Sequence, residues 1–339
     1  MSIKKIIISS LFVLSFGLFT GIANAGCGKV VVASQNWASA ELMAEVDKVI
    51  LEKGYGCEVE LIPGATMPTF TSMDEKGAPD MNPEQWANAV YEPLNKAVDE
   101  GRLVIANKAP ITGLGEGWWL TPGSIKKHPK LKGMTAVDIL KHPEWFPDKE
   151  DPSKGAFHGC PAGWGCQLAN ANLFRAYEME KKRWKLIDPG SAAGLDGSIA
   201  KAAESGNTWF GYYWNPTSIV GKYGLIHLDF GVPYAGDENW NGCIVKPEQE
   251  CTDPKASAWI VSEVNTIITS NFAKQGGKDI VEYIGNRTYP GTVMNGMLVW
   301  MADNQAGGAD AAAEFLSKHE DVWTKWVSSS VVKKVKAGL

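Results

Sequence analysis

The feature that most constrains the fold of this chain is the alternation of short strand-like runs with helix-like segments. Lys29–Ser34 (KVVVAS) is rich in β-branched residues, and apolar positions recur at helical spacing over 42–50. Further strands are predicted at Cys57–Ile62, Leu103–Ala106 and Thr208–Trp214. Strands that alternate with helices favour parallel-rich sheets covered on both faces, which indicates the α/β class.

Four further helices are predicted from local signals. A proline after an asparagine at 82–83 indicates a helix that continues to residue 90, because proline is favoured at the first helical position. Apolar spacing indicates helices over 168–182, 261–272 and 311–326. The chain has 339 residues, 45% of them hydrophobic, which is enough for two lobes that each bury a core.

Met1–Ala25 has the features of a secretory signal peptide. Two lysines precede an apolar run over 6–22, and Ala-Asn-Ala at 23–25 is a cleavage site of small residues. Cleavage after this site predicts a periplasmic protein. It removes two lysines and no acid, so the net charge changes from −5 to 31 − 38 = −7. A membrane anchor and a lipoprotein attached through Cys27 are the alternatives, and Asn24 argues against the second.

Six cysteines in an exported chain favour disulfides over free thiols. The simplest pairing joins the cysteines that flank short loops and leaves the two most N-terminal ones for each other. The predicted pairs are Cys27–Cys57, Cys160–Cys166 and Cys243–Cys251. No cysteine spacing suits zinc, and the acidic run at 148–151 lacks the spacing of a calcium loop, so no metal and no cofactor is expected.

The sequence lacks the motifs that build common catalytic sites. It contains no G-x-x-x-x-G-K-[ST] phosphate loop, no G-x-S-x-G elbow and no H-E-x-x-H helix. Its five histidines are scattered, and no nucleophile is paired with a base. An enzyme is therefore disfavoured, and the negative net charge disfavours nucleic acid as a partner.

The chain contains 14 tryptophans, an unusually large number. Four of them are predicted at strand-to-helix junctions or in a loop before a helix, where open α/β sheets bind ligands. These four are Trp37, Trp86, Trp164 and Trp214. Others are assigned to packing: Trp259, Trp300, Trp323 and Trp326, with packing also favoured for Trp145, Trp184 and Trp240.

Several tryptophan faces around one cavity suit a quaternary ammonium group. Such a cation has no N–H donor, and each face contributes about 0.5–2 kcal/mol through cation–π attraction. Glu116, in a glycine-rich turn, is the predicted polar member of the site, and Trp119 is a fifth aromatic candidate. No arginine falls in the candidate loops, which favours a ligand without a carboxylate.

The chain resembles the periplasmic substrate-binding proteins of ABC transporters for glycine betaine, proline betaine and choline. The resemblance covers residues 28–339 and depends on VVVASQNWASAELMAEV, MNPEQWANAVYEPL, GLGEGWWLTP and TWFGYYWNPTSIVGKYGLIHLD. The segments CPAGWGCQLAN and GEGWW, with the proline-rich insertion before the first of them, are similar to the trimethylamine N-oxide-binding branch. By this resemblance the four tryptophans at junctions form a box around the ligand.

The resemblance implies a two-lobed type II (Venus-flytrap) binding protein whose cleft lies between the lobes. We expect residues 26–112 and 226–339 in the first lobe and residues 113–225 in the second. The expected function is delivery of trimethylamine N-oxide, or a related methylated amine, by a monomer to a separate permease and ATPase. Glycine betaine, choline or dimethylsulfoniopropionate is the alternative ligand, and an exported enzyme or a sensor is the alternative role.

Overall fold

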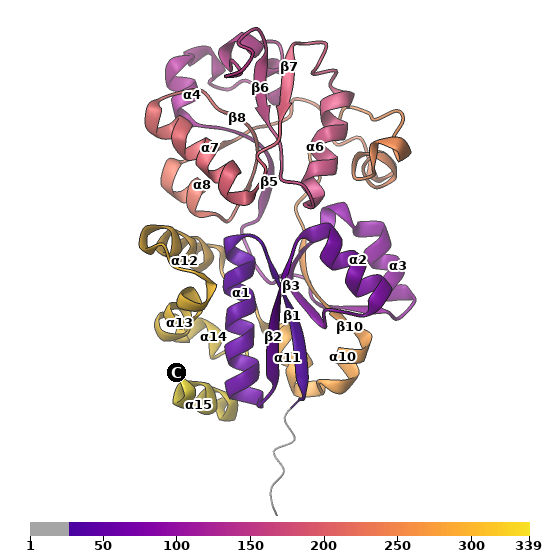
Figure 1. Ribbon diagram of the computed structural model, residues 1–339, viewed down its shortest axis with the longest axis vertical. Helices are drawn as coiled ribbons and strands as arrows, with labels where there is room; N and C mark the ends of the chain where they lie inside the picture. Colours follow the sequence, from indigo (N-terminus) through magenta and orange to yellow (C-terminus); the bar gives the residue numbers. More distant parts are fainter. Residues whose placement is uncertain (1–26) are drawn as a thin grey trace, which may run out of the picture.

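The computed structural model describes residues 27–339, so the predicted signal peptide lies outside the described residues. Two lobes are stacked along the long axis of the molecule, and each is built on one five-stranded sheet (Figure 1). The predicted α/β class and two-lobed architecture are confirmed, although both sheets are mixed rather than mainly parallel. No helix among the described residues is long and apolar enough to span a bilayer.

The first lobe contains a sheet with the strand order β2-β1-β3-β10-β4. The sheet comprises β1 (Lys29–Gln35), β2 (Glu58–Gly64), β3 (Met81–Trp86), β4 (Leu103–Asn107) and β10 (Val264–Thr269). Its helices are α1 (Ala38–Val49), α2 (Thr66–Lys76), α3 (Tyr91–Asp99), α10 (Ser270–Gln275), α11 (Lys278–Asn286), α12 (Gly291–Asn304), α13 (Gly308–Lys318), α14 (Glu320–Trp323) and α15 (Ser329–Gly338). The main core of this lobe joins β1 to α1 and to the C-terminal helices.

The second lobe contains a sheet with the strand order β7-β6-β8-β5-β9. The sheet comprises β5 (Gly115–Leu120), β6 (Gly155–His158), β7 (Trp184–Ile187), β8 (Phe210–Asn215) and β9 (Ile226–His227). Its helices are α4 (Pro122–Lys127), α5 (Ala136–Ile139), α6 (Gly165–Ala176), α7 (Ala192–Ser205), α8 (Ser218–Tyr223) and α9 (Asp237–Asn239). An aromatic core that includes Trp118, Phe157 and Phe210 lies beneath these helices.

Two predicted helices are wrong at sites that matter for the cavity described below. Residues 81–86 form strand β3, followed by a 3₁₀ turn at 87–89, where a helix over 82–90 is predicted. Residues 264–269 form strand β10, and its helix α10 begins only at Ser270. Every residue of β10 is buried, and it pairs with both β3 and β4, so tertiary pairing overrides the local helical spacing.

The predicted return of the chain to the first lobe near residue 226 is too early. Strand β9 pairs with β5, and the segment after it packs in the core of the second lobe through Leu228, Phe230 and Trp240. The chain returns at β10, after crossing between the lobes in an extended segment (Figure 1). The residues between β9 and this extended segment have no clear helical or strand periodicity in the sequence. Periodicity therefore does not indicate to which lobe they belong.

The three predicted disulfides are present: Cys27–Cys57, Cys160–Cys166 and Cys243–Cys251. The first ties the start of β1 to the start of β2, and the second closes the loop that leads into α6. The third closes a loop of the second lobe after α9. Three disulfides are typical of proteins that fold outside the cytoplasm.

Candidate ligand-binding site

A small aromatic cavity lies between the two lobes. The centre of a water molecule can occupy about 30 Å³ of it, which is room for two or three waters. Trp37, Trp164 and Trp214 are only 5%, 4% and 6% exposed, so the lobes are closed around the cavity. The side chains that line it include six tryptophans: Trp37, Trp86, Trp164, Trp214, Trp240 and Trp259.

The first lobe contributes Trp37 and Trp86, which lie at the carboxyl ends of the neighbouring parallel strands β1 and β3. Trp37 comes after β1 and is the N-cap of α1, and Trp86 is the last residue of β3. The indole Nε1 of Trp37 donates a hydrogen bond to Glu84 Oε1 at 2.8 Å, and the Nε1 of Trp86 donates to the same oxygen at 2.9 Å. Glu84 and Trp86 are two residues apart in β3, so their side chains leave the same face of the strand.

The second lobe contributes Trp164 and Trp214, which contact each other at 5.0 Å between ring centroids with nearly perpendicular planes. Trp164 also meets Trp37 of the first lobe at 5.4 Å in an edge-to-face arrangement. Its Nε1 donates to Asn36 Oδ1, in the first lobe, at 2.8 Å. Trp164 therefore touches both lobes, and such edge-to-face pairs favour the closed arrangement.

Glu116 lies on the same face of the second sheet as Trp214, because the two residues are directly opposite each other in β5 and β8. Tyr212 Oη donates to Glu116 Oε1 at 2.7 Å, and Asn88 Nδ2, from the first lobe, donates to Glu116 Oε2 at 2.8 Å. Burial raises the pKa of Glu116 to about 7, against the opposing effect of the hydrogen bonds from Tyr212 and Asn88. The carboxyl group can therefore be ionised or protonated near neutral pH.

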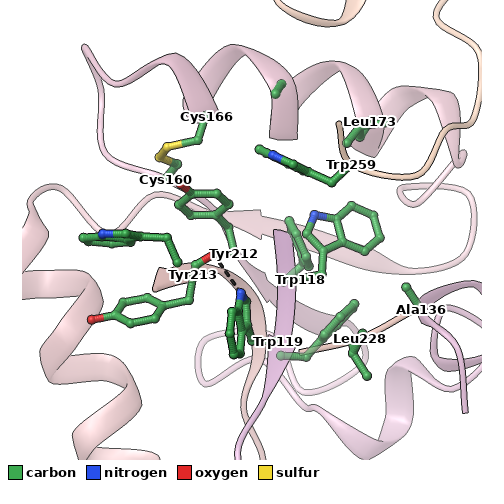
Figure 2. Close-up of a cluster of buried hydrophobic side chains, with 14 of the residues drawn as sticks. Trp118, Trp119, Ala136, Cys160, Cys166, Leu173, Tyr212, Tyr213, Leu228 and Trp259 are labelled. Atoms are coloured by element: carbon green, nitrogen blue, oxygen red, sulfur yellow. Dashed lines mark hydrogen bonds between the residues drawn. A yellow bond between two sulfur atoms is a disulfide. The ribbon is translucent and has the colours of Figure 1, made fainter. Parts of the chain in front are cut away.

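Trp119, the fifth predicted aromatic member, does not line the cavity. Neighbouring residues of a strand point to opposite faces, and Trp119 lies on the face of β5 away from Glu116. Its Nε1 donates to the carbonyl of Tyr213 at 2.8 Å (Figure 2). Its ring packs on His227. Trp118, on the face of Glu116, is fully buried in the core and donates to Asn170.

Trp259 and Trp240 line the cavity although the sequence favours packing roles for both. Trp259 lies in the extended segment that crosses between the lobes, and with Tyr212 it sits beneath helix α6 (Figure 2). It packs edge-to-face against Trp240 at 5.3 Å, and its Nε1 is buried without a hydrogen-bond partner among the described residues. Trp240 Nε1 donates to the carbonyl of Asn88 at 3.0 Å.

Sequence reasoning missed Glu84, Asn88 and Tyr212. Glu84 stands two residues before a predicted box tryptophan, but a helix over 82–90 would place these two side chains on different faces. Tyr212 is two residues before Trp214 in a predicted strand, and this spacing does indicate a shared face. Asn88 lies in a 3₁₀ turn that the sequence does not signal.

The closed arrangement has three direct hydrogen bonds between the lobes beside the Glu116–Asn88 bond. They are Trp164 Nε1 to Asn36 Oδ1, Trp240 Nε1 to Asn88 O, and Met67 N to Gly163 O at 3.1 Å. Away from the cavity, α8 of the second lobe packs on α12 of the first. Over residues 27–339 no group of three or more His, Cys, Asp or Glu side chains is arranged to hold a metal ion.

Solved structures share this fold at low sequence identity. An ABC-transporter choline-binding protein in complex with choline matches with a TM-score of 0.70 and 15% identity, covering 92% of this chain and 98% of its own. The glycine betaine/L-proline-binding protein ProX from Borrelia burgdorferi matches with a TM-score of 0.66 and 16% identity, covering 91% and 99%. Lactococcal OpuAC, closed around glycine betaine, matches with a TM-score of 0.62 and 16% identity, covering 89% and 100%.

Among curated protein sequences, none matches the chain closely enough to count as a relative. The family model for the substrate-binding domain of the ABC-type glycine betaine transport system, OpuAC, matches residues 28–318. This match covers most of the chain and places it among binding proteins rather than enzymes. The chain therefore belongs to the OpuAC family of substrate-binding domains of ABC-type glycine betaine transport systems.

Proposed function

We propose that this protein binds trimethylamine N-oxide, or a closely related small methylated amine, outside the cytoplasm and delivers it to an ABC importer. The observation that carries the proposal is a closed cavity with six tryptophans and one buried carboxyl group, Glu116, in its walls. Aromatic faces attract a methylated ammonium group, which cannot donate N–H hydrogen bonds. The periplasmic location rests on the predicted signal peptide and agrees with the three disulfides.

The polar groups of the cavity favour an N-oxide over a carboxylate. The cavity lining contains no lysine, arginine or histidine within the described residues, so the carboxylate of glycine betaine would have no cationic partner there. Glu116, when ionised, would repel that carboxylate, whereas its protonated form can donate a hydrogen bond to an N-oxide oxygen. The small volume also supports trimethylamine N-oxide, which is more compact than glycine betaine or choline.

Choline is the second candidate, because an ionised Glu116 would attract a permanent cation that has no negative group. Isothermal titration with trimethylamine N-oxide, choline, glycine betaine and dimethylsulfoniopropionate ranks these ligands. We expect the N-oxide to bind in the micromolar range or tighter, where 1 μM corresponds to about 8 kcal/mol. Tightest binding of glycine betaine would contradict the preference for the N-oxide. Absence of binding to all four would contradict the proposed function.

The pH dependence of binding should have opposite signs for the two leading ligands. The pKa of Glu116 is raised to about 7 by burial, so its carboxyl group is protonated below that pH and ionised above it. If the protonated form donates to the N-oxide oxygen, affinity for trimethylamine N-oxide decreases as the pH rises from about 6 to about 8, by at most tenfold per unit. Choline affinity should increase over the same range, because the ionised form attracts the cation.

Glu116→Gln is the control for this titration. The amide keeps the size of the side chain and does not ionise, so the difference between the wild type and the variant isolates Glu116 from other groups that titrate nearby, including Glu84. His227, whose Nε2 lies 3.3 Å from the backbone oxygen of Glu116, has its pKa lowered by burial, and Glu116→Gln keeps this histidine, so its contribution cancels in the comparison. N-oxide affinity that increases with pH through Glu116 would show that the group acts as an anion.

A further inference from the structure

We propose that Glu84 is a positioning residue of the binding site, which fixes the two first-lobe indoles so that they present their faces to a methylated ammonium group. The ligand named in this inference rests on the proposed function. The anchoring of the two indoles by Glu84 does not depend on it. Glu84 is fully buried and is not among the side chains that line the cavity, so it would act through Trp37 and Trp86 rather than by touching the ligand.

The geometry centres on one carboxylate oxygen. Glu84 Oε1 accepts from Trp37 Nε1 at 2.8 Å, from Trp86 Nε1 at 2.9 Å and from Ser39 Oγ at 3.1 Å. An indole has one N–H group, so anchoring it fixes the rotation of the ring about its side-chain bonds. The rings of Trp37 and Trp86 are therefore both held at their N–H edge. Their faces remain available for a ligand.

The buried position of the Glu84 carboxyl group lowers the stability of the fold, which indicates that this residue serves the binding site rather than stability. Oε2 of Glu84 has no hydrogen-bond partner within residues 27–339 and is buried. A buried carboxylate with an unsatisfied oxygen is destabilising, and an amide or an apolar side chain of similar volume would avoid that cost. Groups of this kind are retained where function requires them.

The charged surroundings of Glu84 lie on the side of the lobe core. Arg287 is fully buried, its charge lowers the pKa of Glu84, and its Nε lies 3.1 Å from Asp47 Oδ1. Arg287 also donates to Thr266 Oγ1 at 2.8 Å, and Tyr283 donates to Asp47. Burial outweighs these effects and the three donors, so the pKa of Glu84 is raised to about 7. The carboxyl group therefore ionises near neutral pH.

Ionisation of Glu84 has two consequences for a bound cation. Hydrogen bonds to a charged acceptor are roughly twice as strong as neutral ones, so the indoles are held more firmly when Glu84 is ionised. The negative charge beside the N–H edges of both rings also adds to their attraction for an ammonium group. Glu84 thus supplies negative charge to the site without exposing an oxygen to the ligand.

Glu84→Gln tests the inference, because glutamine has nearly the same size and keeps an acceptor oxygen but cannot ionise. We expect affinity for trimethylamine N-oxide and choline, measured by isothermal titration at about pH 8, to fall roughly tenfold. Glu58→Gln is the matched control, an identical substitution at an exposed position of β2 in the same lobe. Its affinity and pH profile should equal those of the wild type.

The readout that separates positioning from a structural role is the indole N–H resonance. In ¹H–¹⁵N spectra of full-length mature protein labelled at tryptophan, the Trp37 and Trp86 signals should move downfield as the pH rises through about 7, and this titration should vanish in Glu84→Gln. Trp37→Phe and Trp86→Phe assign the two signals. They also test the same bonds if Glu84→Gln does not fold.

The outcomes are distinct. Unchanged affinity together with an unchanged indole titration in Glu84→Gln would overturn the inference while leaving the proposed function intact. A wild-type protein that binds none of the four ligands would contradict the proposed function, and the indole titration would still decide whether Glu84 controls the two rings. Loss of affinity with loss of the indole titration, and with an unchanged Glu58→Gln control, supports the inference.

Discussion

Replacing Gly165 with alanine is expected to weaken ligand binding by roughly tenfold to a hundredfold without unfolding either lobe. Gly165 is the first residue of α6, and a Cβ atom at this position would lie 2.1 Å from the Cβ of Ala89 in the other lobe. Neither atom can rotate away, because each is fixed directly to its backbone. Thr66 Cγ2, also in the first lobe, would be 3.8 Å away. The added methyl group therefore holds the lobes apart.

Gly197→Ala is the matched control for this substitution. Gly197 lies in α7 of the same lobe, and a Cβ atom there meets nothing within 4 Å. Alanine is favoured over glycine within a helix by about 1 kcal/mol, so neither variant should lower the melting temperature of the free protein. Isothermal titration should separate them, with a loss only in Gly165→Ala. Equal affinity of the two variants would show that the ligand-bound lobes do not approach each other at Gly165.

Replacing Trp164 with alanine is expected to cost about 3 kcal/mol of binding free energy, or more than a hundredfold in affinity. The substitution removes one face of the cavity, two edge-to-face contacts and the hydrogen bond to Asn36. Trp37 and Asn36 belong to the first lobe, so the loss affects closure as well as the ligand contact. Titration calorimetry measures the change, and small-angle scattering with saturating ligand reports whether the variant still closes.

Three further variants apportion the loss. Trp164→Phe keeps an aromatic face but not the N–H group, so its affinity should lie between those of the wild type and Trp164→Ala. Trp214→Ala removes a face but no hydrogen bond between the lobes, and we expect a loss of at least about tenfold. Trp145→Ala, in the turn at 143–145 of the second lobe and outside the cavity lining, should leave affinity unchanged. A loss in Trp145→Ala as large as in Trp164→Ala would show that general destabilisation explains both.

The position of aromatic residues relative to strands predicted four of the side chains that line the cavity. Trp37, Trp86, Trp164 and Trp214 were selected because they lie at strand ends or before helices, and the structure brings all four to one cavity. The rule works because the carboxyl ends of strands meet at one edge of a sheet. It also works for Trp86, although the helix predicted around this residue is a strand that ends there.

The rest of the site depends on pairing across the fold, which local sequence does not encode. Strand β3 is an interior strand of its sheet, and its polar residues Asn82, Glu84 and Gln85 are fully buried. A polar sequence of this kind is typical of a surface helix, so the sequence alone does not indicate an interior strand. Trp259 contributes to the cavity from an extended segment with no periodicity. Trp119 was a candidate from the same glycine-rich segment as Glu116, but strand alternation directs it to the opposite face of the sheet.

The hydrogen-bond partners of the tryptophans imply an order of events over time. Trp37 and Trp86 are anchored to Glu84 within their own lobe, so this half of the site is assembled before any ligand arrives. Trp164 finds its partner, Asn36, only in the opposite lobe. We therefore expect a ligand to meet the first lobe before the second, and the Trp164 indole to be buried when the lobes close. We expect the residence time of a captured molecule to depend on how rarely this hydrogen bond and its aromatic contacts break together with the other bonds between the lobes.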